Sequence, residues 1–321
     1  MAADSHRWIG PALRWQALAA GLAVGACSAL AVSGLSFDLG LQIGVLLTGI
    51  VLVGFPHGAF DHLVARPILA PRLGRFWWIP FGLAYVGLAG IICVAWALAP
   101  LLTLLLFLAG SVVHFGLGDI EDAAVPRAVP QWAAVVSYGA LPILLPVAFH
   151  PTEAAPVLAA IGGVAEPAMM TALSNSIWLV PLWVSGMAWM WHATRPPRTS
   201  AILTAITAVG FMTLPPLMAF GLYFGMVHSP RHLLRLAAWY NPCNPHQAAR
   251  WAARVVVPAG MVCALGIGGL VWAEPDASIR ILVPIFRLLA ALTLPHMIVT
   301  TWLSRDAQQG PDGAVRTIPA Q

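Results

Sequence analysis

The stretch WWIPFGLAYVGLAGIICVAWALAPLLTLLLFLAGSVVHFGLG, residues 77–118, runs for 42 residues without one charged side chain. A helix needs about 20 predominantly apolar residues to cross the hydrocarbon core of a bilayer. Residues 77–98 and 100–118 therefore each predict one transmembrane helix. The only ionisable imidazole in this stretch, His114, lies near its end.

The rest of the chain has the same character. Of its 321 residues, 60% are hydrophobic and 9% are charged, whereas a soluble domain carries about 25% charged residues. We expect an all-α fold, a polytopic membrane helical bundle of about ten transmembrane helices. Residues 1–321 are predicted to form one membrane-embedded domain, with short cytoplasmic tails at 1–14 and 304–321. The predicted helices cover residues 15–35, 40–60, 77–98, 100–118, 132–149, 176–193, 200–214, 216–236, 255–273 and 281–303.

The positive charges support this division into helices. All 16 basic residues are arginines, and with a cytoplasmic N-terminus 14 of them fall on cytoplasmic connections. Such an excess is what the positive-inside rule predicts. Both termini are therefore predicted to be cytoplasmic, in a multi-pass protein of the inner (plasma) membrane, with the 150–175 connection on the other side. Residues 155–172 are predicted to be an interfacial or re-entrant element. Arginines spread this thinly indicate membrane orientation, and no nucleic-acid partner is expected.

Four histidine motifs interrupt the apolar segments near one end of the bundle. They are PHGAFDH at 56–62, HFGLGD at 114–119, HSPRH at 228–232 and PH at 295–296. Ionisable groups are costly at membrane depth and mark functional sites there. His57, His114 and the His228/His232 pair belong to predicted helices that run in the same direction. Because bundle metal sites are built from facing side chains, we expect these four histidines to bind one metal ion. For the His228/His232 pair alone, two interfacial histidines at a helix end remain an equal alternative.

The ligand type allows several metals, since imidazole suits zinc, copper, iron and nickel. Four neutral imidazoles leave a divalent ion its full charge and, in octahedral geometry, two open positions. Such a centre fits iron(II), Fe(II), that binds and activates dioxygen. Zinc would favour a closed site or hydrolysis, and no serine or cysteine nucleophile set is visible. A non-haem iron oxygenase in a lipid-embedded bundle implies a substrate dissolved in the membrane.

Two carboxylates lie close to these histidines in sequence. Asp61 follows His57 by four residues, so that a continuous helix would place both on one face. A carboxylate there can hold the second ring nitrogen of a metal-binding histidine and fix its tautomer. Asp119 is the corresponding candidate for His114, at a less favourable spacing of five residues. For both aspartates, a solvated helix end is the alternative.

Two further histidines and four aromatic residues are weaker candidates. His62 lies about 140° around an ideal helix from His57, so a role beside the metal rather than on it is expected. His296 is another candidate for such a supporting role, and a packed, hydrogen-bonded histidine is its alternative. Four aromatic side chains flank the motifs and are candidates to line an apolar substrate tunnel, although core packing is the more frequent role: Phe55, Phe115, Tyr223 and Phe224.

One family shows the same motifs in the same order. In this chain they stand at residues 54–62, 114–116, 223–224, 228–232 and 294–296. The chain closely resembles the Brp/Blh family of bacterial and archaeal β-carotene 15,15'-dioxygenases, the bacteriorhodopsin-related proteins, over residues 40 to 303. The resemblance implies a multi-pass membrane enzyme that cleaves β-carotene at its central double bond with O2. It implies two retinals as products, which can supply a microbial rhodopsin. It also implies that His57, His114, His228 and His232 bind the iron.

Two other classes of protein stay open. A membrane di-iron desaturase or hydroxylase also joins histidines to a lipid substrate, but it needs many more of them, in HxxxH and HxxHH boxes. This chain has one HxxxH pair and no adjacent histidines. The second class is not enzymatic: a histidine-rich membrane transporter or a haem-binding carrier. A Soret absorption band in the purified protein would identify haem.

Overall fold

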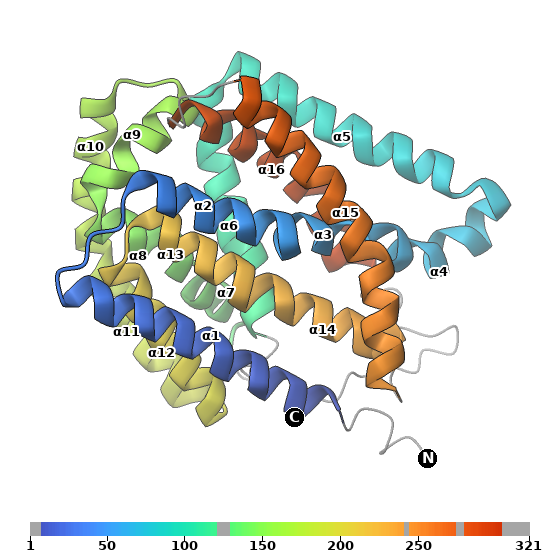
Figure 1. Ribbon diagram of the computed structural model, residues 1–321, viewed down its shortest axis with the longest axis horizontal. Coiled ribbons are helices and arrows are strands. Elements are labelled where there is room, and N and C mark those ends of the chain that lie inside the picture. Colours follow the sequence, from blue (N-terminus) through green and yellow to red (C-terminus); the bar gives the residue numbers. More distant parts are fainter. Residues whose placement is uncertain (1–7, 121–128, 241–243, 274–278, 304–321) are drawn as a thin grey trace.

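The computed structural model describes residues 8–120, 129–240, 244–273 and 279–303, and within these ranges every regular element is a helix. Figure 1 shows them as one bundle. The helices are α1 (Ile9–Val32), α2 (Leu39–Gly49), η1 (Ile50–Gly54), α3 (Phe55–Gly58), α4 (Asp61–Leu73), η2 (Gly74–Phe76), α5 (Trp78–Leu98), α6 (Pro100–Ile120), α7 (Gln131–Gly139), α8 (Leu141–Phe149), α9 (Pro151–Gly162), α10 (Glu166–Asn175), η3 (Ser176–Leu179), α11 (Val180–Thr194), α12 (Arg198–Thr213), α13 (Pro216–Leu222), η4 (Tyr223–His228), α14 (Ser229–Tyr240), α15 (Pro245–Ala273), α16 (Ile279–Ile298) and η5 (Val299–Leu303).

The polytopic helical bundle expected from the sequence is confirmed. Among the described residues, eight helical segments are long and apolar enough to cross a membrane. The two other predicted segments, 200–214 and 216–236, are also helical. The first corresponds to α12, which has only 16 residues. The second corresponds to α13, η4 and α14, and its last part carries Arg231 and Arg235, so its composition is less apolar than that of a simple span.

The outer surface of the bundle is apolar, as a lipid environment requires. Helix α5 shows this most clearly, because Trp96 is its only buried residue. Leu83 and Val86 on α5 are each 71% exposed and Leu98 is 79% exposed. A row of large apolar side chains on the surface marks contact with a partner or a membrane. In a helix of this length and composition, the membrane is the natural partner.

The segment predicted as interfacial or re-entrant, residues 155–172, is a helical hairpin. Helix α9 has 12 residues, which is too short to cross the hydrocarbon core. Gly163 caps its end, and the φ of 64° at this residue lies in the left-handed region that favours glycine. Helix α10 then runs on into η3 and α11, and the candidate span begins at residue 166 rather than 176. The connection at 150–175 is therefore built from helices rather than from an open loop.

Arg287, the one arginine inside the last predicted span, has a structural partner at this hairpin. Its Nη2 donates a hydrogen bond to the carbonyl oxygen of Ile161 at 3.0 Å. Its guanidinium also lies 5.4 Å from the centre of the Trp96 ring. The last carbonyls of a helix have no partner within the helix and attract positive charge. Arg287 therefore fixes the end of α9 within the bundle.

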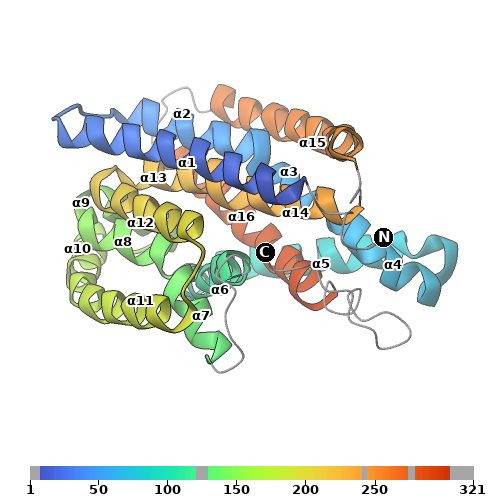
Figure 2. The ribbon, with the colours of Figure 1, turned by 90° about the horizontal axis from the view of Figure 1, so that it is seen from below.

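Helices α13, η4 and α14 form one long rod that lies beside α1 and α2 (Figures 1 and 2). Glycines allow its close approach to α2: a Cβ on Gly221 would lie 2.8 Å from the Cα of Leu46. A glycine also allows α6 to pack closely against α7, since a Cβ on Gly116 would lie only 2.1 Å from the carbonyl oxygen of Val135. Small residues at such crossings are the usual way for membrane helices to pack. Both crossings lie beside the histidine motifs.

Candidate metal centre

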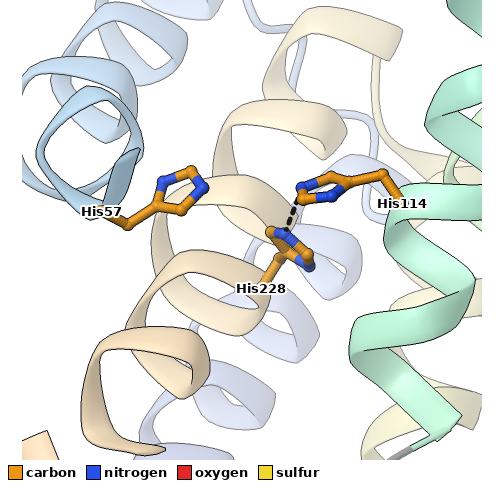
Figure 3. Close-up of side chains that lie close together, drawn as sticks. All are labelled: His57, His114 and His228. Atoms are coloured by element: carbon orange, nitrogen blue, oxygen red, sulfur yellow. Dashed lines mark hydrogen bonds between the residues drawn. The ribbon is translucent and has the colours of Figure 1, made fainter. Parts of the chain in front are cut away.

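Five histidines from four separate parts of the chain meet in the bundle. His57 lies in α3, His114 near the end of α6, His228 at the end of η4, His232 in the first turn of α14, and His296 near the end of α16. Figure 3 shows that the rings of His57, His114 and His228 point towards one another. Sequence separation therefore does not prevent the histidine motifs from forming one cluster, which we call the histidine cluster.

A local feature of the backbone accompanies two of these positions. His57 follows the π-helical turn η1, and His228 ends the π-helical turn η4. Such turns inside α-helices are frequent at functional sites, because they redirect a few side chains without ending the helix. Pro230 in the HSPRH motif leaves one carbonyl of this rod without its usual donor. Proline cannot donate to the carbonyl four residues earlier, that of Met226, and the side-chain amide of Gln16 on α1 donates to this carbonyl instead.

The same Gln16 also binds the buried guanidinium of Arg231 on α14. Its Oε1 accepts a hydrogen bond from Nε of Arg231 at 3.1 Å. One turn further along α14, Nη1 of Arg235 donates to the carbonyl oxygen of Gly118 at 3.1 Å. The arginines of the HSPRH motif and its surroundings thus connect α14 to α1 and α6. These contacts hold the helices that carry His228 and His114 in register.

Three of the four predicted ligands form the tightest group. His57, His114 and His228 each offer a ring nitrogen, and these nitrogens lie within 4.8 Å of one another. The Nε2 atoms of His114 and His228 are 3.1 Å apart. Two imidazole nitrogens that bind one ion at right angles, each about 2.1 Å from it, lie about 3 Å apart. The pair therefore has a separation that suits two ligands of one ion.

The fourth predicted ligand, His232, lies beside this group but outside it. Its ring centre is 5.6 Å from that of His57. Its Nε2 is buried and has no hydrogen-bond partner in the described residues. The structure brings all four predicted histidines together, with His232 at the edge, and their role as ligands stays a prediction.

The histidine cluster fits a metal ion because its polar atoms are otherwise unsatisfied. Both ring nitrogens of His57, and Nε2 of His232 and of His296, are buried without a hydrogen-bond partner among the described residues. A buried polar atom without a partner is costly, and native structures avoid it. An ion that accepts one lone pair from each ring would remove most of this cost. The donor set is all imidazole, which suits iron as well as zinc, copper and nickel.

The interpretation of Asp61 as the partner of His57 is wrong. The Asp61 carboxylate is 3% exposed, and its Oδ1 lies 2.8 Å from Nδ1 of His296. Its Oδ2 accepts a hydrogen bond from the Tyr85 hydroxyl at 2.9 Å. The expected pairing fails because the helix breaks: α3 ends at Gly58 and α4 begins at Asp61. A four-residue spacing places two side chains on one face only in a continuous helix.

Asp119 was the candidate partner of His114. Its carboxylate makes a contact with Tyr223, and this contact does not support that pairing. Asp119 Oδ2 accepts a hydrogen bond from the buried Tyr223 hydroxyl at 3.0 Å, while Nε2 of His114 faces His228. His62 is exposed, and its Nδ1 lies 2.8 Å from the carbonyl oxygen of Ala59. His62 thus stands at the edge of the site rather than within the histidine cluster.

A cavity of about 450 Å³ opens from the histidine cluster. His57, His114 and His296 form part of its wall, and most of the other lining residues are apolar. The polar exceptions are Asp61, His62, Tyr85, Ser111, Glu153 and Thr293. Of the four aromatic residues predicted to line a tunnel, Phe55, Phe115 and Phe224 line this cavity. Tyr223 does not, since it faces a separate small cavity together with Asp119 and Arg231.

Sequence reasoning missed Tyr85 altogether. Its hydroxyl is the polar end of a chain that reaches Asp61 and then His296. A signal was present: the chain has only four tyrosines, and Tyr85 stands alone as a hydroxyl-bearing aromatic residue within the uncharged stretch 77–98. An isolated tyrosine in a membrane helix needs a partner for its hydroxyl if it faces inward.

The sequence is similar to one family of known proteins. The family model "Beta-carotene 15,15'-dioxygenase" matches residues 48–304. This range contains all five residues of the histidine cluster. A "Probable beta-carotene 15,15'-dioxygenase Blh" of Halobacterium salinarum is 29% identical over 318 residues, 90% of this chain and 92% of that protein. A "Beta-carotene 15,15'-dioxygenase" of an uncultured marine bacterium is 26% identical over 262 residues, 80% of this chain and 92% of that protein. No solved structure matches the chain.

Proposed function

The chain belongs to the beta-carotene 15,15'-dioxygenase family, and from this premise we propose that it cleaves β-carotene at the central double bond inside the membrane. The observation that carries the proposal is the histidine cluster in the wall of an apolar cavity. In the reaction the central carbon–carbon double bond breaks, and each of its two carbons takes one atom of O2. One carotene and one O2 therefore give two molecules of retinal.

The proposed cofactor is iron(II), held by His57, His114, His228 and His232. When it is bound, iron supplies the binding and activation of dioxygen. The protein contributes the neutral imidazoles and the buried surroundings that keep their lone pairs available. A buried polar group with no other partner gains most from a ligand that satisfies it. Because this donor set is chemically compatible with other metals, iron is part of the proposal.

The cavity provides the proposed substrate site. Its apolar wall includes Phe115, Phe224 and Phe286, and a hydrocarbon that leaves the lipid phase can pack against these side chains by van der Waals contact. His57 and His114 lie in the same wall, so a polyene in the cavity passes directly beside the histidine cluster. The apolar wall also keeps water away from the reacting carbons.

We place the route from the lipid phase to the cavity beside α5. Val86 on this helix lines the cavity and is 71% exposed, so its side chain does not close the cavity off. A carotenoid dissolved in the bilayer would reach the cavity from the side at this position, without passing through water.

The setting of the reaction is also proposed. We place the protein in the inner (plasma) membrane with both termini in the cytoplasm, on the strength of the one-sided arginines. Retinal is apolar enough to remain in the bilayer after release. A microbial rhodopsin in the same membrane is then a suitable acceptor for it.

The proposal is tested with membranes that contain the full chain. Membranes supplied with iron(II), O2 and β-carotene should form about two retinals per carotene consumed, as the central cleavage of a symmetric C40 chain requires. Membranes with His57→Ala serve as the control and should form none. Long apocarotenals without retinal would show cleavage at another bond and contradict the proposal. A Soret band, or oxidised products that keep the full carbon chain, would instead favour a haem carrier or a desaturase-type enzyme.

A further inference from the structure

His296 is the histidine whose placement differs most from expectation. The sequence suggested a packed residue or a supporting role, yet its ring lies closest to His57. Their ring centres are 4.8 Å apart, whereas those of His232 and His228 lie 5.6 Å and 6.0 Å from that of His57. We propose that His296 supplies a fifth nitrogen, its Nε2, to the metal ion of the histidine cluster, oriented by Asp61 and Tyr85. The inference rests on the metal site assigned under the proposed function.

The position of His296 relative to the other rings supports this role. Its ring centre lies 5.3 Å from that of His114 and 5.7 Å from that of His232. His296 stands outside the group of three nitrogens formed by His57, His114 and His228, and so does His232. By distance to the other rings, His296 is therefore placed at least as well as His232, which the family motif suggests as a ligand.

The two nitrogens of His296 have different surroundings. Nδ1 lies 2.8 Å from Oδ1 of Asp61. A neutral ring therefore carries its proton on Nδ1, and this N–H donates a hydrogen bond to the carboxylate. Nε2 is then left with a lone pair, and it is buried without a hydrogen-bond partner among the described residues. A ring that is only packed in the core would be better served by a second partner. The arrangement is that of a metal ligand whose tautomer a carboxylate fixes.

The support extends one step further, to α5. The Tyr85 hydroxyl donates to Oδ2 of Asp61 at 2.9 Å, so both carboxylate oxygens are engaged by neighbours. Asp61 and His296 are 3% and 5% exposed, and a charged carboxylate at this depth needs such partners. The chain Tyr85–Asp61–His296 joins α5, α4 and α16. It holds one imidazole at the junction between the histidine cluster and the cavity.

A fifth imidazole has a chemical consequence. It adds no charge, so the ion keeps its full divalent charge. In an octahedral site it reduces the positions open to outside ligands from two to one. His296 combines a carboxylate partner with a place in the cavity wall. Its loss as a ligand should therefore open a second position from the cavity side.

The test uses cobalt(II), because the visible bands of this ion report its coordination without any enzyme reaction. The purified full chain in detergent is loaded with cobalt(II), and its cobalt content, affinity and visible spectrum are measured. His296→Ala should weaken cobalt binding at least tenfold, since loss of even a supporting partner costs about 10–100-fold, and should change the visible bands. Added imidazole should restore the spectrum, because the vacated space opens to the cavity.

Three further variants sharpen the test. His192→Ala removes an exposed histidine at the end of α11 and should bind cobalt as the wild type does. Asp61→Asn should weaken binding less than His296→Ala, since an amide oxygen still accepts from Nδ1 but lacks the charge. His296→Gln, which keeps more of the volume, replaces His296→Ala if size-exclusion chromatography shows that the alanine variant does not fold. His296→Gln and His296→Ala should both alter the visible bands of the bound cobalt.

The outcomes separate this inference from the proposed function. Wild-type affinity and an unchanged spectrum in His296→Ala would overturn the fifth ligand, whatever happens to β-carotene. Unchanged cobalt binding in both His57→Ala and His296→Ala would overturn the metal centre as a whole, and the fifth ligand with it. Loss of cobalt in His296→Ala together with a wild-type iron protein that makes no retinal would support the fifth ligand and refute the proposed function.

Discussion

The Nε2 atoms of His114 and His228 lie 3.1 Å apart, although 114 positions separate the two residues in the chain. At this distance one ring must donate its N–H to the lone pair of the other, because two facing lone pairs repel. An ion between the helices would take the Nε2 lone pairs of both rings, and the ring that donates in its absence would then carry its proton on Nδ1. The pair is therefore the first contact between two rings of the histidine cluster to examine by mutation.

His114→Ala should abolish retinal formation and lower the iron content of the purified protein at least tenfold, because it removes one member of this pair. The measurements are iron per protein and retinal formed from β-carotene. His192→Ala, at an exposed position, is the matched control and should retain both. Full iron content and activity in His114→Ala would refute the four-histidine site.

Gly116→Ala should destabilise the bundle and reduce iron content. A Cβ at this position would lie 2.1 Å from the carbonyl oxygen of Val135, so α6 and α7 would have to move apart. Overpacking of this kind costs about 1–3 kcal/mol or more. Gly110→Ala on the same helix is the control, because a Cβ there meets nothing within 4 Å. Thermal unfolding in detergent should show a lower Tm only for Gly116→Ala, and equal Tm values would contradict the close packing.

Tyr223→Phe should destabilise the protein by about 1–3 kcal/mol, since it removes a donor from the Asp119 carboxylate inside the bundle. The hydroxyl is buried and donates to Asp119 at 3.0 Å. Asp119→Asn keeps an acceptor for this hydroxyl, and its midpoint shows how much the charge of the carboxylate adds. Unfolding midpoints in detergent measure both variants. A Tyr223→Phe protein as stable as the wild type would show that the bond contributes nothing.

The orientation of the chain in the membrane is open to a direct test. Reporter fusions after Arg198 and after Glu153 should give opposite readouts, cytoplasmic for Arg198 and external for Glu153, because the arginines lie so one-sidedly. Matching readouts would contradict the predicted number of crossings between the two positions. The short α9 makes this comparison informative, since Glu153 lies in a helix of 12 residues that does not cross the membrane by itself.

The sequence by itself determined the class of fold and singled out the histidines that the bundle brings together. Segments such as 77–98 are too long and too apolar for a soluble bundle, and the histidines could be recognised as exceptions within them. Similar depth in predicted helices that run in the same direction was enough to group His57, His114 and the His228/His232 pair. Hydrophobic length and charge distribution are local properties, so a sequence displays them directly.

Only the tertiary structure decided which carboxylate meets which ring. Spacing suggested Asp61 for His57, but the helix breaks between Gly58 and Asp61 and turns the carboxylate towards His296 on α16. Nothing near Asp61 in the sequence points to a residue 235 positions away, or to the Tyr85 hydroxyl. A helix break rotates everything that follows it, and the neighbours found after that rotation depend on how distant helices pack.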